Sequence, residues 1–157
     1  MTLIDRLSQS GLQAVEATSF VSPKAIPQLA DGKEVLAKIS KVKGVDYPVL
    51  VPNVRGMDGA ISCNVDEIAV FSAASEAFTK KNINATIDES LAKFEKVMAM
   101  AVANDIRVRG YVSCVMGCPY EGDIDPKMVN QVSQKLLDMG CYEISLGDTI
   151  GIGTPRK

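Results

Sequence analysis

The stretch that decides the fold runs over residues 108–146, VRGYVSCVMGCPYEGDIDPKMVNQVSQKLLDMGCYEISL. It begins with an apolar run at 108–112 and ends with a second run at 143–146, and each run predicts a strand. An Asp-Pro pair and a later Gly mark the two ends of a helix predicted over 126–139. A strand, a helix and a strand in succession indicate a βαβ unit with parallel strands.

The remainder of the chain repeats this alternation. Further strands are expected at 12–17, 48–51 and 67–71. Helices are expected at 2–10, 31–42, 57–63 and 87–104. Near-continuous apolar runs are typical of parallel strands that helices cover. We therefore expect an α/β protein with about five parallel strands and intervening helices, in a single domain over residues 1–157.

Composition limits the chemistry. The chain has no His, which excludes Ser-His-Asp catalysis, Cys-His catalysis and His-based zinc sites within it. A net charge of −2 gives no basic excess for nucleic acid, and no apolar run reaches the roughly 18 residues of a membrane span. The four thiols are expected to be reduced, and the spacing of two of them argues against a Cys-x-x-Cys motif: Cys63, Cys114, Cys118 and Cys141.

Several polar residues lie in or just after the predicted strands, where parallel α/β folds place their active groups. Glu16 and Arg109 fall inside apolar runs, where a charge is costly unless it is paired. They are expected to pair with each other or to hold a polar substrate, with a surface position or a plain ion pair as the alternative. Asp148 is either a site residue or a turn residue. Three more residues are candidates for the site, with the alternative that they are ordinary polar residues of loops: Ser19, Asn53 and Ser75.

Two glycine-rich or basic segments suggest anion binding only weakly. Residues 80–82 (KKN) predict a small basic loop that could contact a phosphate or simply face solvent. Residues 147–153 (GDTIGIG) lack the glycine spacing of a dinucleotide-binding motif.

Six longer motifs carry a resemblance to a known family. They are residues 16–24 (EATSFVSPK), 72–76 (SAASE), 78–84 (FTKKNIN), 109–114 (RGYVSC), 117–122 (GCPYEG) and 140–149 (GCYEISLGDT). Together they resemble the 3-hydroxy-3-methylglutaryl-CoA lyases over essentially the whole chain, more than the related isopropylmalate and citramalate synthases.

The resemblance implies a (β/α)₈ barrel and a carbon–carbon lyase. Members cleave 3-hydroxy-3-methylglutaryl-CoA to acetyl-CoA and acetoacetate, in leucine degradation and ketone-body formation, with Mg²⁺ or Mn²⁺ in the complete enzyme. The implied partner is an acyl-CoA substrate, without nucleic acid or membrane, and the complete enzyme is a possible homodimer. The implied compartment is the mitochondrial matrix, or the cytoplasm for a bacterial source.

The sequence departs from the family pattern at its flanks. It contains no Arg-Asp-Gly motif, no His-x-His motif and no Gly-Gly-Cys-Pro-Tyr stretch. The resemblance therefore implies a partial barrel from the first helix to the sixth strand, lacking the first strand and the last two βα units. Such a chain is expected to be inactive and marginally stable alone. The alternative is a non-catalytic copy that binds CoA esters or associates with the full-length enzyme.

The residues that match family motifs have supporting roles, and none is a metal ligand. Glu16 resembles an acidic residue near the metal, and Arg109 and Tyr111 resemble residues that line the acyl site. The other matched positions resemble the sixth-strand polar cluster and the CoA-facing loop: Ser145, Asp148, Thr149, Lys81 and Asn82.

Overall fold

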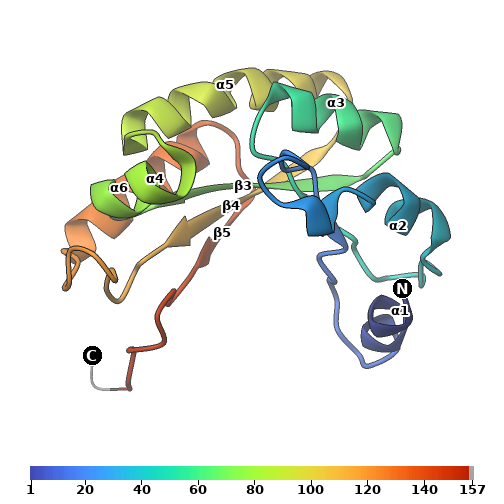
Figure 1. The fold of residues 1–157 in the computed structure, drawn as a ribbon, viewed down its shortest axis with the longest axis horizontal. Coiled ribbons are helices and arrows are strands. Elements are labelled where there is room, and N and C mark those ends of the chain that lie inside the picture. The colour runs from blue at the N-terminus through green and yellow to red at the C-terminus, as the bar shows by residue number, and fades with distance from the viewer. Residues whose placement is uncertain (156–157) are drawn as a thin grey trace. The chain divides into compact units, whose positions relative to one another are not determined.

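The computed structural model describes residues 1–155 and contains a five-stranded sheet with the order β1-β2-β3-β4-β5 (Figure 1). The strands are β1 Thr18–Ser19, β2 Val49–Leu50, β3 Glu67–Ala73, β4 Arg107–Ser113 and β5 Glu143–Leu146. The pairs β1–β2, β2–β3 and β4–β5 are parallel. The expected sheet of parallel strands is confirmed.

Six α-helices and one short 3₁₀ helix separate the strands in the described part of the chain. They are α1 Thr2–Ser8, η1 Pro27–Leu29, α2 Gly32–Lys38, α3 Val54–Ser62, α4 Glu76–Ile83, α5 Ile87–Ala103 and α6 Pro126–Asp138. The chain forms two compact units. The first contains Met1–Ala69 and Ala99–Arg107, and the second contains Val70–Met98 and the chain from Val108 onward.

The first unit is built on β2 and α3. Val49 and Met57 are fully buried. The Asn53 side chain accepts a hydrogen bond from the Gly56 backbone N–H at 3.0 Å, which caps α3 at its first turn. A buried carboxylate lies at the start of β3, where Glu67 is 2% exposed and pairs with the guanidinium of Arg107 at 2.8 Å.

In the second unit, α4, α5 and α6 lie on one side of β4 and β5 (Figure 1). The spacing of apolar residues in the sequence predicts a buried stripe on α5, which the burial of Leu91 and Phe94 confirms. The same spacing predicts a stripe on α6 with Val132, Leu136 and Leu137. The first two are buried, whereas Leu137 is 43% exposed, so the prediction is wrong there.

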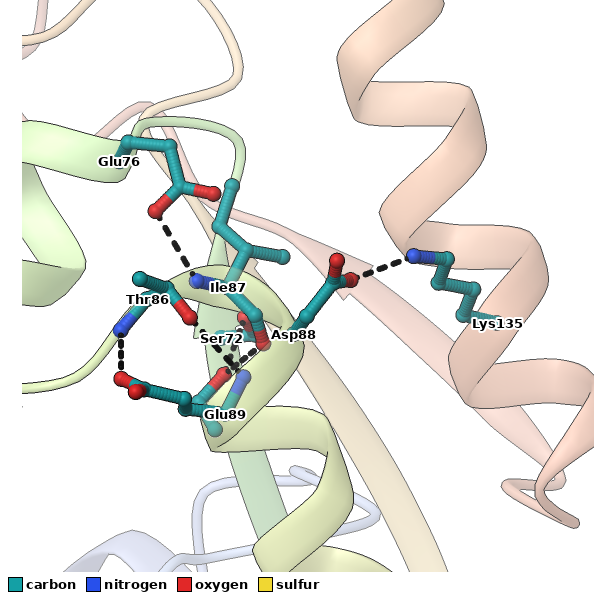
Figure 2. A network of polar contacts seen from close by, with 8 residues as sticks. Ser72, Glu76, Thr86, Ile87, Asp88, Glu89 and Lys135 are labelled. Carbon is teal, nitrogen blue, oxygen red and sulfur yellow. Dashed lines mark hydrogen bonds and ion pairs between the residues drawn. The ribbon is translucent and has the colours of Figure 1, made fainter.

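A set of polar contacts fixes the start of α5 (Figure 2). The Thr86 hydroxyl accepts from the Glu89 backbone N–H at 3.1 Å, and the Glu89 carboxylate accepts from the Thr86 N–H at 2.8 Å. This reciprocal pair is a capping box with Thr86 as the cap. The Glu76 carboxylate accepts from the Ile87 N–H at 3.1 Å. Asp88 pairs with Lys135 of α6 at 2.6 Å, which joins the two helices.

Two sequence predictions fail in the first unit. The strand predicted at 12–17 is wrong, because the regular strand begins only at Thr18. Before it, the N–H groups of Val15 and Ala17 donate to the carbonyls of Asp46 and Pro48, and the pairing stays an isolated bridge between Ala14 and Asp46. Glu16 is therefore not inside a strand. The helix predicted at 31–42 ends at Lys38, since the next residue is extended with ψ 144°.

The helix α4 was not predicted, and the basic loop expected at 80–82 is wrong because these residues form its last turn. Ser75 caps the helix by accepting from the Phe78 N–H at 3.0 Å, and Asn84 ends it in the left-handed conformation with φ 50°. Only Thr79 of this helix is buried, so its sequence carries little amphipathic signal.

Candidate functional site

One face of β4 and β5 carries a row of polar side chains. The strand register sets Arg109 beside Glu143 and Tyr111 beside Ser145. These residues alternate with Gly110, which faces α6 because a Cβ there would lie 3.2 Å from Leu136 Cδ1. The polar row therefore points away from α6. We take this row as the candidate site of the second unit.

Arg109 is held at the centre of this row by two neighbours. Its Nη2 donates to the Glu143 carboxylate at 2.8 Å, and its guanidinium carbon lies 5.7 Å from the centre of the Tyr111 ring. The side chain is 25% exposed, and its buried Nε has no hydrogen-bond partner among the described residues. An arginine with one N–H left over can donate to a carboxylate or carbonyl oxygen of a ligand.

The sequence did not indicate Glu143, which supplies the charge opposite Arg109. The predicted pairing of Arg109 with Glu16 stays a prediction, because Glu16 is exposed and belongs to the first unit. Glu143 precedes Ser145 by two residues, the spacing that places two strand residues on one face. This period-two pattern could have identified it.

Asp148 and Thr149, just after β5, both hold backbone. The Asp148 carboxylate accepts from the Ile152 N–H at 3.2 Å and from the Gly153 N–H at 2.7 Å. It therefore anchors the turn that follows the strand, as the alternative interpretation proposed. The Thr149 hydroxyl accepts from the Cys114 N–H at 2.7 Å, which ties the ends of β4 and β5 together.

Lys81 and Asn82 are exposed on α4. The Lys81 ammonium lies 4.0 Å from the centre of the Tyr120 ring, a cation–π contact that holds this helix against the loop after β4. Lys81 thus lies near that loop and not on the polar row of β4 and β5.

The loop after β4 contains a pair of buried cysteines with unequal surroundings. Burial raises the pKa of the Cys118 thiol, but hydrogen bonds from the Ser75 hydroxyl and from the backbone N–H groups of Tyr120 and Glu121 outweigh it, so the pKa is lowered overall. Burial raises the pKa of Cys114 to about 11. Ser75 Oγ lies 3.0 Å from Cys118 Sγ.

A separate cleft of about 570 Å³ lies in the first unit, at the carboxyl ends of β1 and β2. Its wall includes Ser19, whose hydroxyl lies 3.5 Å from the Leu50 carbonyl oxygen, and Asn53, which caps α3. Both predicted polar residues thus have local structural partners. Two cations also line this cleft, Lys33 of α2 and Arg55 of α3, and no motif in the sequence indicated them.

Two further findings concern residues 1–155. No group of three or more His, Cys, Asp or Glu side chains is arranged to hold a metal ion in this part of the chain. The residues described here thus do not fit a complete cation site.

Over the same residues, every helix is too short or too polar to cross a membrane.

Parallel strands alternating with helices, with polar side chains on the face of β4 and β5 that points away from α6, define an α/β protein. The family follows from comparison with known proteins. A family model described as HMGL-like matches residues 1–157, and the chain belongs to this family.

Named relatives are similar over nearly all of the chain. The bovine mitochondrial hydroxymethylglutaryl-CoA lyase is 62% identical over 153 residues, which are 98% of this chain and 47% of the relative. A mouse lyase named cytoplasmic is 58% identical, over 98% of this chain and 45% of the relative. The expected compartments agree with these names.

Solved structures agree as well. The hydroxymethylglutaryl-CoA lyase of Pseudomonas aeruginosa is 53% identical with a TM-score of 0.93, over 98% of this chain and 51% of that chain. A lyase from Acinetobacter baumannii, solved with coenzyme A and 3-methylmalate, is 35% identical with a TM-score of 0.93, over 99% and 50%. The predicted partial barrel of parallel strands is confirmed. The chain spans about half the length of the relatives that it matches.

Proposed function

We propose that this chain is the central part of a hydroxymethylglutaryl-CoA lyase, which cleaves 3-hydroxy-3-methylglutaryl-CoA to acetyl-CoA and acetoacetate. The observation that carries the proposal is the match of the family model over residues 1–157, together with 62% identity to a named lyase. The aligned region of 153 residues is 98% of the chain, so it includes strands, helices and the polar row.

Within this proposal, the polar row of β4 and β5 contacts the acyl part of the substrate. Arg109 supplies the positive charge, and its free Nε–H is available to a substrate oxygen. Tyr111 and Ser145 lie side by side in the strand register and flank it on the same face. Thr149 and Asp148 shape the loop at the carboxyl end of β5. For Glu16 we propose the supporting role that the resemblance implies.

The divalent cation expected from the resemblance, Mg²⁺ or Mn²⁺, belongs to the proposed complete enzyme. When bound, such a cation polarises the substrate's oxygens and stabilises developing negative charge. Residues 1–155 do not fit a complete site for it, so no step of the reaction is assigned to it here.

The acyl-CoA partner is supported by the Acinetobacter baumannii lyase, whose structure contains coenzyme A. We propose that Lys81 and Asn82 face the CoA part of the substrate, as their exposure on α4 allows. Calorimetry with a CoA ester tests whether the chain binds it alone. The absence of heat at millimolar ester would contradict binding by the isolated chain.

A chimera tests the activity. Residues 1–157 replace the matching segment of the Pseudomonas aeruginosa lyase, and acetoacetate release is measured with added Mg²⁺. We expect the chimera to be active, and Arg109→Met to lower its kcat/KM by about 10²-fold, the usual cost of removing a donor to developing charge. Gln134→Ala is the matched control, because the exposed Gln134 lies on α6 and donates a hydrogen bond to the exposed Asp138. A chimera that melts cooperatively but releases no acetoacetate would refute the proposal.

The isolated chain is the second arm of this experiment. We expect it to release no acetoacetate. Release at a rate close to that of the chimera would overturn the expectation that the chain needs the rest of the barrel.

A further inference from the structure

The ion pair between Arg109 and Glu143 is set up by the backbone of β4 and β5. The Tyr142 N–H donates to the Val108 carbonyl at 3.0 Å, and the parallel register then places Glu143 directly beside Arg109. Backbone hydrogen bonds hold this register, so it does not depend on the charge of the Glu143 side chain. A substitution that removes only the charge should therefore leave the two strands in place.

The geometry of the pair restrains the Arg109 side chain. Its Nη2 donates to Glu143 Oε1 at 2.8 Å, the length of a charge-assisted hydrogen bond. No other carboxylate among residues 1–155 pairs with this guanidinium. A guanidinium is planar, so holding one of its nitrogens against the neighbouring strand limits the directions of the remaining N–H groups. The Nε–H that lacks a partner is one of these groups.

Stability alone does not account for a carboxylate at this position. The Arg109 and Glu143 side chains are 25% and 48% exposed, and partly exposed ion pairs contribute little net free energy to folding. A long Arg side chain without a partner samples many rotamers and turns its charge toward water. Glu143 opposes this motion and keeps the guanidinium near the Tyr111 ring, with its central carbon 5.7 Å from the ring centre.

We propose that Glu143 is a positioning residue, which holds the Arg109 guanidinium in the direction in which it donates to the acyl oxygens of the substrate. Glu143 acts through Arg109 and does not itself contact the substrate. This inference rests on the proposed lyase function. It predicts that the effect of Glu143 on the reaction disappears when Arg109 is absent.

A double-mutant cycle in the Pseudomonas aeruginosa chimera tests this dependence. Glu143→Gln keeps the size of the side chain and removes its charge. It should lower kcat/KM for acetoacetate release about tenfold, because a misplaced group can cost up to about 10²-fold. In the Arg109→Met background the same substitution should change kcat/KM by less than about twofold. An equal loss in both backgrounds would overturn the proposal, because Glu143 would then act independently of Arg109.

Asp138→Asn is the matched control for the loss of one negative charge. Asp138 is exposed on α6, where its carboxylate accepts from the Gln134 amide at 2.8 Å, and the polar row points away from this helix. The variant should keep kcat/KM within about twofold of the chimera, because salt screens exposed charges that lie apart. A tenfold loss in this control would show a general effect of charge and would overturn the specific role of Glu143.

A measurement on the full chain separates this proposal from the lyase function. NMR measures the exchange of the Arg109 Nε–H with water, and Arg107, which pairs with Glu67 and Asp46, is the internal comparator. Glu143→Gln should speed this exchange several-fold at Arg109 alone, because a released side chain exposes its Nε to water. Unchanged exchange at Arg109 would overturn the positioning role even in an active chimera. An inactive chimera with the exchange effect intact would refute the lyase function and leave the positioning of Arg109 standing.

Discussion

Gly110 in β4 is the position where one added methyl group should cost a measurable amount of stability. A Cβ at this residue would lie 2.8 Å from Ile144 Cδ1, 3.2 Å from Leu136 Cδ1 and 3.3 Å from Cys141 Sγ. Non-bonded carbon atoms pack at about 3.5–4.0 Å, so all three contacts are too short. Leu136 is fully buried and cannot move away, whereas Ile144 lines an open apolar groove and can rotate.

The magnitude follows from this difference. Overpacking costs about 1–3 kcal/mol in a rigid core, and Gly→Ala recovers about 0.4–1 kcal/mol by restricting the unfolded chain. We therefore expect Gly110→Ala to lower the free energy of unfolding by about 1–2 kcal/mol, measured by urea denaturation. Gly147→Ala is the matched control: its Cβ would lie 3.5 Å from the nearest atom, and its effect should stay within about 0.5 kcal/mol.

A double-mutant cycle identifies the atom responsible. Ile144→Val removes the Cδ1 atom that clashes, and in the wild type it should cost about 0.5–1.5 kcal/mol. In the Gly110→Ala background it should cost at least about 0.5 kcal/mol less, because it also relieves the overlap. An Ile144→Val cost that is the same in both backgrounds would refute the reasoning, as would a Gly110→Ala variant as stable as the wild type.

Three further predictions concern charged and buried groups. The hydrogen bond from the Thr86 N–H lowers the pKa of Glu89. The capping box therefore stabilises the fold above pH 4.5, and this stabilisation is lost as the pH falls through the lowered pKa. Glu89→Gln should remove this acid dependence of the melting temperature, and an unchanged pH profile would contradict the prediction. Arg107→Met removes the ion pair to the buried Glu67 carboxylate and should cost about 2 kcal/mol in urea unfolding, less than for two fully buried charges because Arg107 is half exposed; a cost below about 0.5 kcal/mol would count against this ion pair. Burial raises the pKa of Cys141 to about 11, so iodoacetamide at pH 8 should alkylate it far more slowly in the folded chain than in urea, and equal rates would show that it is not buried.

The sequence predicted elements whose signal is local. The bounds of β5, Glu143–Leu146, are confirmed, and α6 begins at Pro126 as its Asp-Pro cap predicts. The failures lie where the signal is tertiary. β1 is only Thr18–Ser19, because pairing with β2 and not an apolar run decides where it forms. α4 has one buried residue, so periodicity could not reveal it.

The sequence indicated polar positions that share a face of the sheet, but it did not indicate their contacts. The motif positions on β4 and β5 do share one face, as the register of Tyr111 and Ser145 shows. The partner of Arg109 could not be predicted, because Glu143 is 34 residues away and only the strand register brings it close. The contact of Ser75 with Cys118 spans 43 residues and depends on a helix that the sequence did not indicate.

Cys114 adopts φ 62°, a left-handed conformation that costs a side-chain-bearing residue about 1–2 kcal/mol and glycine almost nothing. Glycine at this position would relieve the backbone but would also remove a fully buried side chain, at a cost of about the same size. The two effects nearly cancel. Stability alone therefore gives little reason to prefer a side chain with a thiol to the hydrogen atom of glycine at this turn.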